Sequence, residues 1–271
     1  MPLPDRPRVV ITGAASGLGH AFALELARSK SARVLVADVN LEGAEETARL
    51  VREAGGEAST VKCDVSRREE VLALPDEADR ALGGTDFLIN NAGVAVGGMM
   101  GDVPLEDWDW VMGINLWGVI YGCHAFAPRL RAQRHGAILN VASAAGLLCA
   151  PPLMPYNVTK AGVVALSETL RAELGPSGVT VTVLCPTFFK TGIAASGRTH
   201  VPGAGPEAVE RMMARSKVQA DGVAQFAIKA VDRGDLYALP HADGRVAWHL
   251  KRSAPQAFYD WIVPRVMRRM K

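Results

Sequence analysis

Thr12-Gly13-Ala14-Ala15-Ser16-Gly17-Leu18-Gly19 directly follows the apolar run Arg8–Thr12 and leads into a segment whose apolar residues have helical spacing. A strand, a glycine loop and a helix in this order are typical of a phosphate-binding turn. Gly13 permits the tight turn, Gly17 lets a pyrophosphate approach the backbone, and Gly19 allows the helix to pack closely on the strand. Free amides at the helix N-terminus then face the phosphates. The stretch therefore predicts a dinucleotide-binding α/β fold, since an ordinary turn needs no such ordered spacing.

Short runs rich in Val, Ile and Leu alternate along the rest of the chain with longer segments that have apolar residues at every third or fourth position. The expected strands are Arg8–Thr12, Arg33–Asp38, Ser59–Cys63, Phe87–Asn90, Ala137–Ala142, Val179–Leu184 and, more weakly, Leu236–Leu239. The expected helices are Leu18–Lys30, Leu41–Ala54, Arg67–Leu82, Pro104–Gln133, Pro155–Leu174 and Asp221–Asp232. Continuous apolar strands indicate a sheet that helices cover on both faces. The pattern predicts an α/β fold with a Rossmann-like, doubly wound parallel sheet of about seven strands.

The composition fits one globular domain over residues 1–271, with its core at about 8–239. Of the 271 residues, 49% are hydrophobic and 21% are charged, which excludes a disordered chain. The least regular stretch is Gly192–Gly205, which precedes a candidate helix at Pro206–Lys217. A loop of this length inside a compact domain is commonly a lid. We therefore expect a flexible flap over about residues 192–217.

Cysteine content and charge exclude several classes of protein. The four cysteines are dispersed and form no CxxC pair, which predicts buried thiols in a reducing compartment and no metal site. The first residues lack the apolar run of an export signal, and no window of about 20 apolar residues could span a bilayer. We expect a soluble, cytoplasmic protein. Residues 245–271 carry a net charge of +6 and the first 244 a net charge of −4, which argues against a nucleic-acid-binding protein.

Asp38 ends the second expected strand, 19 residues after the last glycine of the loop. A carboxylate there accepts hydrogen bonds from the ribose hydroxyls of an adenosine and repels a 2′-phosphate. Position 16 in the loop is Ser rather than Arg or Lys, and Val39-Asn40 after Asp38 is uncharged. Neither place therefore supplies a cation for a 2′-phosphate. These residues favour NAD over NADP. The alternative is that Asp38 only caps the helix that begins near Leu41.

Further motifs along the chain share the order and spacing of one known family. They are Cys63-Asp64-Val65, Asn90-Asn91-Ala92-Gly93, Asn115 within Ile114-Asn115-Leu116, Ser143, and the YxxxK sequence Tyr156-Asn157-Val158-Thr159-Lys160. Together with the TGxxxGxG loop at residues 12–19, they resemble the short-chain dehydrogenase/reductase family from about Arg8 to Leu239. Each motif alone is modest, and their shared order makes the resemblance specific.

Tyr156 and Lys160 are four residues apart on an expected helix, so both side chains lie on one face. A phenol with a pKa of about 10 is a poor base. We expect the Lys160 ammonium and a positive nicotinamide ring to lower the pKa of Tyr156 into the range for acid–base catalysis. Ser143 follows a strand end, where its hydroxyl can donate a hydrogen bond to the substrate oxygen. Taken singly, these residues could be a surface aromatic, a solvated charge and a turn residue.

The resemblance implies the remaining roles. Asn115 would hold a water beside Lys160, Phe189 would align the carboxamide through its backbone amide, and Thr191 would contact the carboxamide or the pyrophosphate. The implied cofactor-binding residues are Gly13, Ser16, Gly17, Leu18, Gly19, Asp38, Asp64, Val65, Asn91, Tyr156, Lys160, Phe189 and Thr191. The implied catalytic residues are Asn115, Ser143, Tyr156 and Lys160. The reaction would be hydride transfer between C4 of the nicotinamide and a secondary alcohol or ketone, without a metal.

One position departs from the family pattern. After the sixth strand the family usually has a Pro-Gly pair, whereas Thr187 follows Pro186 here. We therefore expect the backbone at Thr187 to avoid a positive φ angle. The change puts the local loop shape and the cofactor orientation in doubt, but not the hydride chemistry.

The expected substrate side is apolar, because no charged residue occurs between Val141 and Thr159. Its candidate lining residues are Leu147, Leu148, Pro151, Pro152, Leu153, Met154, Met99, Met100, Phe188, Phe189, Met212 and Met213. They predict a pocket for a bulky hydrophobic alcohol or ketone rather than a sugar or small acid. The alternative is that half of them belong to the core.

An NAD-dependent oxidoreductase is the leading interpretation. The alternatives are an NADP-linked carbonyl reductase of the same fold and a non-catalytic dinucleotide-binding regulatory protein. Family members are usually dimers or tetramers, so the resemblance implies a homodimer or homotetramer joined by Trp110–Arg131 and Tyr156–Leu174. The apolar residues of the first segment exceed what one helix face can bury; they are Leu116, Trp117, Val119, Ile120 and Phe126.

The tail Phe258–Lys271 mixes aromatic, aliphatic and basic residues. Weak contact with an anionic membrane surface is one interpretation. A cover over the substrate mouth, packing on another subunit and a frayed terminus remain open as well.

Overall fold

The computed structural model describes residues 2–193, 196–201, 207, 211, 213–214 and 216–265. Its centre is a seven-stranded sheet with the strand order β3-β2-β1-β4-β6-β7-β9, in which every pair is parallel. The strands are β1 (Arg8–Thr12), β2 (Arg33–Asp38), β3 (Glu57–Lys62), β4 (Phe87–Asn90), β6 (Gly136–Val141), β7 (Val179–Leu184) and β9 (Tyr237–Ala238). The strand order reverses at β1, between β2 and β4. Open α/β sheets bind ligands at the carboxyl ends of the strands that flank such a reversal.

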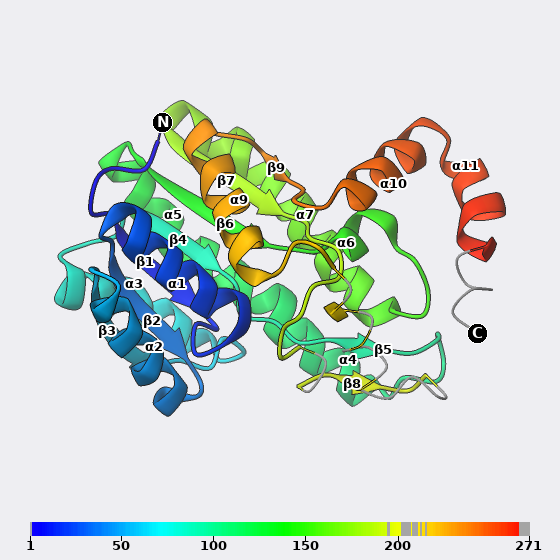
Figure 1. Cartoon of the computed structure of the whole chain (residues 1–271), viewed down its shortest axis with the longest axis horizontal. Coiled ribbons are helices and arrows are strands. Elements are labelled where there is room, and N and C mark those ends of the chain that lie inside the picture. The colour runs from blue at the N-terminus through cyan, green and yellow to red at the C-terminus, as the bar shows by residue number, and fades with distance from the viewer. Residues whose placement is uncertain are drawn as a thin grey trace.

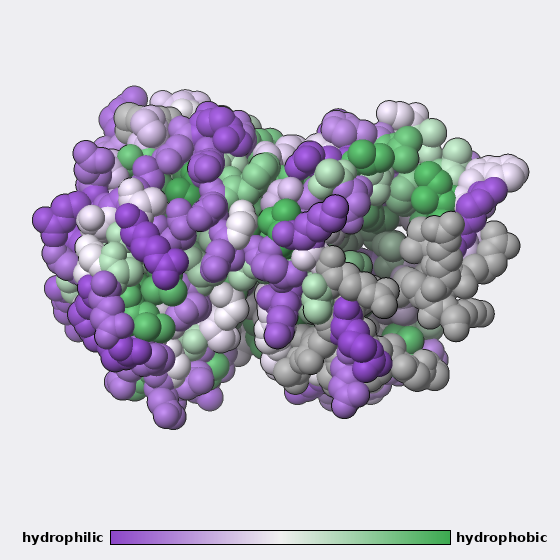
Figure 2. Space-filling model, viewed as in Figure 1, coloured by the Kyte–Doolittle hydropathy of each residue, from purple (hydrophilic) through white to green (hydrophobic). Residues whose placement is uncertain are grey.

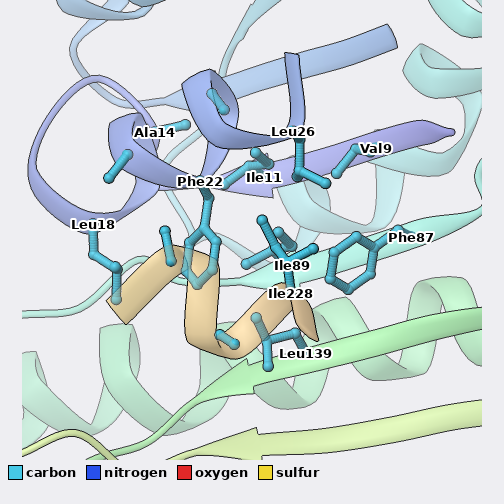
Figure 3. Close-up of a cluster of buried hydrophobic side chains, with 14 of the residues drawn as sticks. Val9, Ile11, Ala14, Leu18, Phe22, Leu26, Phe87, Ile89, Leu139 and Ile228 are labelled. Carbon is cyan, nitrogen blue, oxygen red and sulfur yellow. The ribbon is translucent and has the colours of Figure 1, made fainter. Parts of the chain in front are cut away.

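Helices cover both faces of the sheet (Figure 1). One face carries α1 (Gly17–Lys30), α2 (Leu41–Glu53) and α9 (Ala220–Arg233), and the other carries α3 (Arg68–Leu82), α5 (Gly118–Gln133) and α7 (Met154–Leu174). Because successive strand residues point to opposite faces, Val9 and Ile11 join the first core and Val10 joins the second. Figure 3 shows Val9 and Ile11 in one cluster with Phe22 of α1 and Ile228 of α9. The predicted doubly wound parallel sheet is confirmed.

The expected strand boundaries agree closely with the observed ones, since β1, β2, β4 and β7 coincide with them. The third expected strand begins two residues earlier than expected, at Glu57, and the fifth, which is β6, begins one residue earlier, at Gly136. The weakest expected strand, Leu236–Leu239, retains only Tyr237–Ala238 as β9, which pairs with β7 at the sheet edge. Strong apolar runs thus located the strands well, and the polar third strand was located less well.

The long helix expected over Pro104–Gln133 is interrupted. It consists of α4 (Leu105–Met112), the π-helix η1 (Gly113–Trp117) and α5. The apolar spacing continues through the junction, so the sequence carries no sign of the change in helix type. π-Helical turns occur frequently at functional sites, and this one contains Asn115.

Other elements were not expected. The strands β5 (Val96–Gly97) and β8 (Arg198–Thr199) form a separate parallel pair, and α6 (Ala144–Leu148) lies within the expected loop before α7. The tail contains α10 (Ala242–Ser253), α11 (Pro255–Ala257) and the π-helix η3 (Phe258–Ile262), and a 3₁₀ turn, η2 (Gly175–Ser177), follows α7. Figure 1 shows α10 and α11 extending away from the sheet, on the right of the view.

Part of the expected flap at 192–217 lies outside the described residues, including half of the candidate helix Pro206–Lys217. The segment 196–201 is described and contains β8. All four cysteines are free thiols; Cys149 is partly buried and the other three are buried. Within the described ranges, no helix combines the length and apolarity that a membrane crossing requires.

Candidate active site

The glycine loop leaves β1 with the backbone conformation that its glycines predict. Gly13 has a φ of +63°, and a Cβ there would lie 2.7 Å from the Ala92 Cα, so no side chain fits. Gly17 has a φ of +57°, and among the described residues only the Thr191 Cβ comes within 4 Å of an added Cβ, at 3.8 Å. The loop backbone is therefore open at Gly17, at the N-terminus of α1. This cradle fits a pyrophosphate, and Thr191 lies beside it as expected.

Asn91 braces the glycine loop from the end of β4. Its side-chain amide donates hydrogen bonds of 2.9 Å to the carbonyl oxygens of Thr12 and Gly13, and its backbone amide donates one of 3.0 Å to the Thr12 hydroxyl. Sequence reasoning placed Asn91 at the cofactor. The structure places its side chain against the loop, so it shapes the phosphate cradle from behind.

Asp38 lies at the carboxyl end of β2, beside the glycine loop. Its carboxylate accepts hydrogen bonds of 2.9 Å from the backbone amides of Ala15 and Asn40. The cap of α2 is Asn40, whose side chain accepts a hydrogen bond from the Gly43 amide. The alternative in which Asp38 only caps α2 is therefore wrong, and its carboxylate faces the loop.

Asp64 and Val65 follow the neighbouring strand, β3. The Asp64 carboxylate accepts hydrogen bonds from the amide and hydroxyl of Ser66, at 2.9 and 2.7 Å. Val65 is buried, and an added Cβ at Gly118 would lie 3.0 Å from its Cβ. The Cys63 amide donates to the Asp38 carbonyl at 2.9 Å. The pair therefore lies at the same sheet edge as Asp38, where an adenine could reach both.

Lys160 is buried beneath the loop that follows β6. Its side chain is on α7, is 2% exposed, and donates a hydrogen bond of 2.8 Å to the Val141 carbonyl. Its Nζ is 5.7 Å from the centroid of the Tyr156 ring, one helical turn earlier. Burial lowers the pKa of the Lys160 ammonium to about 8. At neutral pH the group is therefore still mainly a cation.

The Tyr156 hydroxyl behaves differently from the sequence-based expectation. Burial raises its pKa to about 12, and a hydrogen bond with Ser143 offsets part of that rise. The expected lowering also required a bound positive nicotinamide ring and stays a prediction, because the protein groups alone shift the pKa of Tyr156 upward. Desolvation disfavours the phenolate more strongly than the neighbouring groups stabilise it.

Ser143 is placed by the short helix α6. It is the N-cap of α6, and its hydroxyl oxygen accepts a hydrogen bond of 3.1 Å from the Ala145 amide. The hydroxyl also lies 3.5 Å from the Pro186 carbonyl oxygen, to which it can donate. Ser143 therefore has the structural role of capping α6, which fits the alternative of a turn residue. Its side chain is also a hydrogen-bonding neighbour of Tyr156.

Asn115 lies in η1 and is completely buried. Its side chain accepts a hydrogen bond from the Val94 amide and donates one to the Val94 carbonyl, both at 2.8 Å. An added Cβ at Gly93 would lie 3.3 Å from its Oδ1 and 3.4 Å from the Lys160 Nζ. The two side chains therefore converge on one glycine. Gly93 is a site residue whose role the sequence did not reveal, although it is part of a quoted motif.

The loop after β7 has the conformation that its threonine predicts, because Thr187 is absent from the residues with positive φ. Its amide donates a hydrogen bond of 3.2 Å to His241 Nδ1. Phe189 is buried and stacks on the same imidazole, with 6.2 Å between ring centroids. An added Cβ at Gly244 would lie 2.7 Å from the Thr187 Cγ2. The loop is thus fastened to the start of α10 at the position where the family has glycine.

The residues expected to line the substrate pocket differ in how far they are buried. Leu147 and Phe189 belong to the hydrophobic cores, and Met213 is buried. Four others have exposed side chains, namely Met99, Met100, Met154 and Phe188. Leu148, Pro151, Pro152 and Leu153 are partly buried, and Met212 lies outside the described side chains.

A family model described as short chain dehydrogenase matches residues 7–201. The Probable oxidoreductase EphD of Mycobacterium tuberculosis is 33% identical over 257 residues, covering 92% of this chain and 43% of that protein. The chain thus spans less than half the length of this relative. Human Epidermal retinol dehydrogenase 2 is 35% identical over 198 residues, 72% of this chain and 64% of that protein. The D-threitol dehydrogenase of Mycolicibacterium smegmatis is 38% identical over 187 residues, 69% and 72% of the two chains.

Two solved structures are similar over nearly the whole chain. A short chain dehydrogenase/reductase from Burkholderia phymatum in complex with NAD has a TM-score of 0.84 and 36% identity, and the match covers 93% of this chain and 95% of that chain. A short-chain dehydrogenase from Sphingobium yanoikuyae in complex with NADPH has a TM-score of 0.77 and 26% identity, covering 96% of each chain.

Proposed function

The chain belongs to the short-chain dehydrogenase family, and on this premise we propose that it is an NAD-dependent oxidoreductase interconverting a hydrophobic secondary alcohol and its ketone. One observation carries the proposal: Tyr156 neighbours both Ser143 and Lys160 at the sheet edge from which the open glycine loop also extends. The loop follows β1, the Ser143 segment follows β6, and β4 lies between these strands. A substrate oxygen at Tyr156 would therefore be near a nicotinamide whose pyrophosphate sits on the loop.

Each polar side chain of the site has a distinct task in the proposed reaction. When bound, the nicotinamide supplies or accepts the hydride at C4. The Tyr156 hydroxyl would give its proton to the ketone oxygen during reduction, and the Tyr156 phenolate would take the alcohol proton during oxidation. The Ser143 hydroxyl, already a hydrogen-bonding neighbour of Tyr156, orients the same substrate oxygen.

Lys160 and Asn115 act behind Tyr156. The Lys160 ammonium donates a hydrogen bond to the Val141 carbonyl and lies near the Tyr156 ring. Its positive charge opposes the effect of burial on Tyr156 and favours the phenolate when a proton must be taken up. Asn115 fixes the Val94 backbone beside Lys160, and we assign to it the support of a water relay.

The preference for NAD rests on Asp38. Its carboxylate is held beside the loop by two backbone amides, at the position where an adenosine ribose would bind. A 2′-phosphate there would face a fixed negative charge. The two solved neighbours contain NAD in one case and NADPH in the other, so an NADP-linked reductase is the alternative that the assay must separate.

The preference for a hydrophobic substrate rests on the uncharged segment between Val141 and Thr159 and on its exposed apolar side chains, such as Met154. Relatives of similar identity differ in their named substrates, since one is a retinol dehydrogenase and another a D-threitol dehydrogenase. The discriminating test follows nicotinamide absorbance with NAD and NADP across aryl, terpenoid and steroid alcohols and a set of polyols. We expect turnover with NAD and hydrophobic alcohols. Faster oxidation of polyols would overturn the substrate class, and no turnover with any pair would favour a regulatory dinucleotide-binding protein.

Assembly and the tail are also proposals. We propose a homodimer or homotetramer formed through α5 and α7, because Trp117 is 48% exposed at the start of α5 and stacks on Tyr121. Val119 and Phe126, also named for this surface, belong to the chain's own core.

Figure 2 shows apolar side chains gathered over the α10–α11 arm. We propose a weak contact of this arm with anionic membranes, to be tested by vesicle sedimentation with and without residues 258–271.

A further inference from the structure

Asp107 of α4 holds a segment that is distant in the sequence. The residue is 8% exposed, and its carboxylate accepts hydrogen bonds from Arg198 and from His200 Nε2, the latter at 2.6 Å. The Arg198 guanidinium also lies over the Trp110 ring, 3.9 Å from its centroid. The hydrogen bonds from His200 and Arg198 hold the pKa of Asp107 below its usual value. A charged, buried carboxylate thus binds one side chain of β8, that of Arg198, and the side chain of His200, which directly follows β8.

Backbone pairing holds the same strand in register. In the β5–β8 pair, Val96 lies opposite Arg198 and Gly97 opposite Thr199. The Arg198 amide donates to the Ala95 carbonyl at 2.9 Å, and the His200 amide donates to the Gly97 carbonyl at 2.8 Å. Two-residue strands have little stability of their own. The side-chain cluster around Asp107 is therefore the main anchor of β8 among the contacts described.

β5 connects this cluster to the loop that precedes Tyr156. The Gly98 amide donates a hydrogen bond of 2.6 Å to the Pro152 carbonyl, and Gly98 forms a β-bridge with Leu153. Leu153 is the N-cap of α7, three residues before Tyr156. A Cβ added to Gly97 would lie 3.4 Å from the Thr199 Oγ1 and 3.7 Å from the Leu153 Cδ2. The strands β5 and β8 and the loop before α7 are therefore in close contact.

The other end of β5 leads to the second half of the site. The chain enters β5 from Val94, whose amide and carbonyl are both bonded to the Asn115 side chain. The segment that contains β5 thus contacts Asn115 at its start, through Val94, and Leu153 at its end, through Gly98. The strand β8 pairs with β5 between these two contacts. Residues 94–98 and 198–200, here called the wall, therefore pair with one another and border Leu153, three residues before Tyr156.

We propose that Asp107 is a positioning residue for substrate binding, because it fastens residues 198–200 onto β5 and so fixes the wall beside Leu153 and Tyr156. This inference rests on the proposed oxidoreductase function. When the wall is already ordered, less conformational entropy is lost as a large substrate binds against it. A small substrate that reaches only Tyr156 and Ser143 gains little from it. The cluster therefore favours bulky substrates over small ones.

The kinetic test compares Asp107→Asn with Asp109→Asn in the full chain. Asp109 is an exposed carboxylate on the same helix, outside the cluster. For Asp107→Asn we expect a KM at least tenfold higher for 1-phenylethanol, a KM for propan-2-ol changed less than threefold, and kcat changed less than threefold for both. Asp107→Glu should recover part of the loss. Equal effects on both alcohols, or a loss of kcat alone, would overturn the proposal.

Hydrogen exchange tests the anchoring independently of turnover. The Arg198 and His200 amides should exchange at least tenfold faster in Asp107→Asn, while the β6 amides keep their rates and NAD binding is unchanged. If Asp107→Asn does not fold, Arg198→Met leaves Asp107 and His200 in place and removes the guanidinium, with its charge and its hydrogen bond to Asp107. Unchanged exchange at residues 198–200 in the folded variant would refute the anchor. Faster exchange without any measurable enzyme activity would leave the anchor in place and reject the proposed function instead.

Discussion

The Ala15 amide of the glycine loop donates a hydrogen bond of 2.9 Å to the Asp38 carboxylate at the end of β2. The loop that would hold the pyrophosphate and the side chain that would recognise the ribose are thus joined directly. Asp38 cannot turn away from the ribose position without leaving a loop amide without its acceptor. In the proposed function, the side chain that would choose between NAD and NADP is therefore fixed to the glycine loop.

Asp38→Asn keeps an acceptor for the Ala15 amide and removes the charge. We expect the NADP-to-NAD ratio of kcat/KM to rise about tenfold or more, because the loss of about 1.4 kcal/mol of repulsion corresponds to a factor of ten. Glu42→Gln removes an equally negative charge from the first turn of α2 and should leave the ratio unchanged. The same ratio in Asp38→Asn and the unmodified protein would mean that another residue selects the cofactor.

Gly146→Ala should separate the two helices that carry Ser143 and Lys160. An added Cβ would lie 2.4 Å from the Lys160 carbonyl carbon, so the α6–α7 contact must open. We expect the free energy of unfolding to fall by about 1–3 kcal/mol, measured by urea denaturation. Gly113→Ala is the control, because that residue is helical and an added Cβ there would lie in ordinary contact with the Ser66 Cβ, 3.7 Å away. Equal stability of both variants would show that the helices can move apart without cost.

The buried Lys160 ammonium predicts a specific dependence of stability on pH. Its folded pKa of about 8 lies below the unfolded value of 10.5. Below pH 8 both states are protonated, and the folded state bears the full cost of the buried charge. Between pH 8 and 10.5 the unfolded state binds more protons, so the free energy of unfolding rises with pH, by about 3 kcal/mol in total.

The measurement compares Tyr156→Phe with the double variant Tyr156→Phe/Lys160→Met by urea unfolding from pH 7 to 10.5. Removing the phenol from both proteins eliminates its own titration from the comparison. The protein with Lys160 should gain stability relative to the double variant as the pH rises. Parallel curves would mean that Lys160 is not desolvated in solution.

Much of the fold could be predicted because the information is local. Continuous apolar runs such as Val9–Ile11 mark buried parallel strands, and the glycine loop fixes the order of strand and helix. Ser143, Tyr156 and Lys160 were found for the same reason, since their spacing places them on a strand end and one helix face. The structure brings these residues together as expected.

The features that were missed depend on tertiary contacts. Asp107 and Arg198 are 91 residues apart, and the two-residue strands that join their segments have no periodic pattern. The π-helix around Asn115 interrupts a continuous apolar spacing, and the glycines that bracket it, Gly113 and Gly118, do not by themselves indicate a change of helix type. The direction of the Tyr156 pKa depends on how completely neighbouring segments exclude water from the phenol. A sequence shows which groups are present and does not show how deeply they are buried.

The most direct test of the central claim is the rate of nicotinamide reduction by Tyr156→Phe at saturating NAD and secondary alcohol. Tyr121→Phe removes a hydroxyl of the same kind from α5 and serves as the control. If Tyr156 moves the proton, its variant should bind NAD normally and turn over about 10²–10⁴-fold more slowly, while the control keeps its rate. A Tyr156→Phe protein that reduces NAD as fast as the unmodified enzyme would contradict the account.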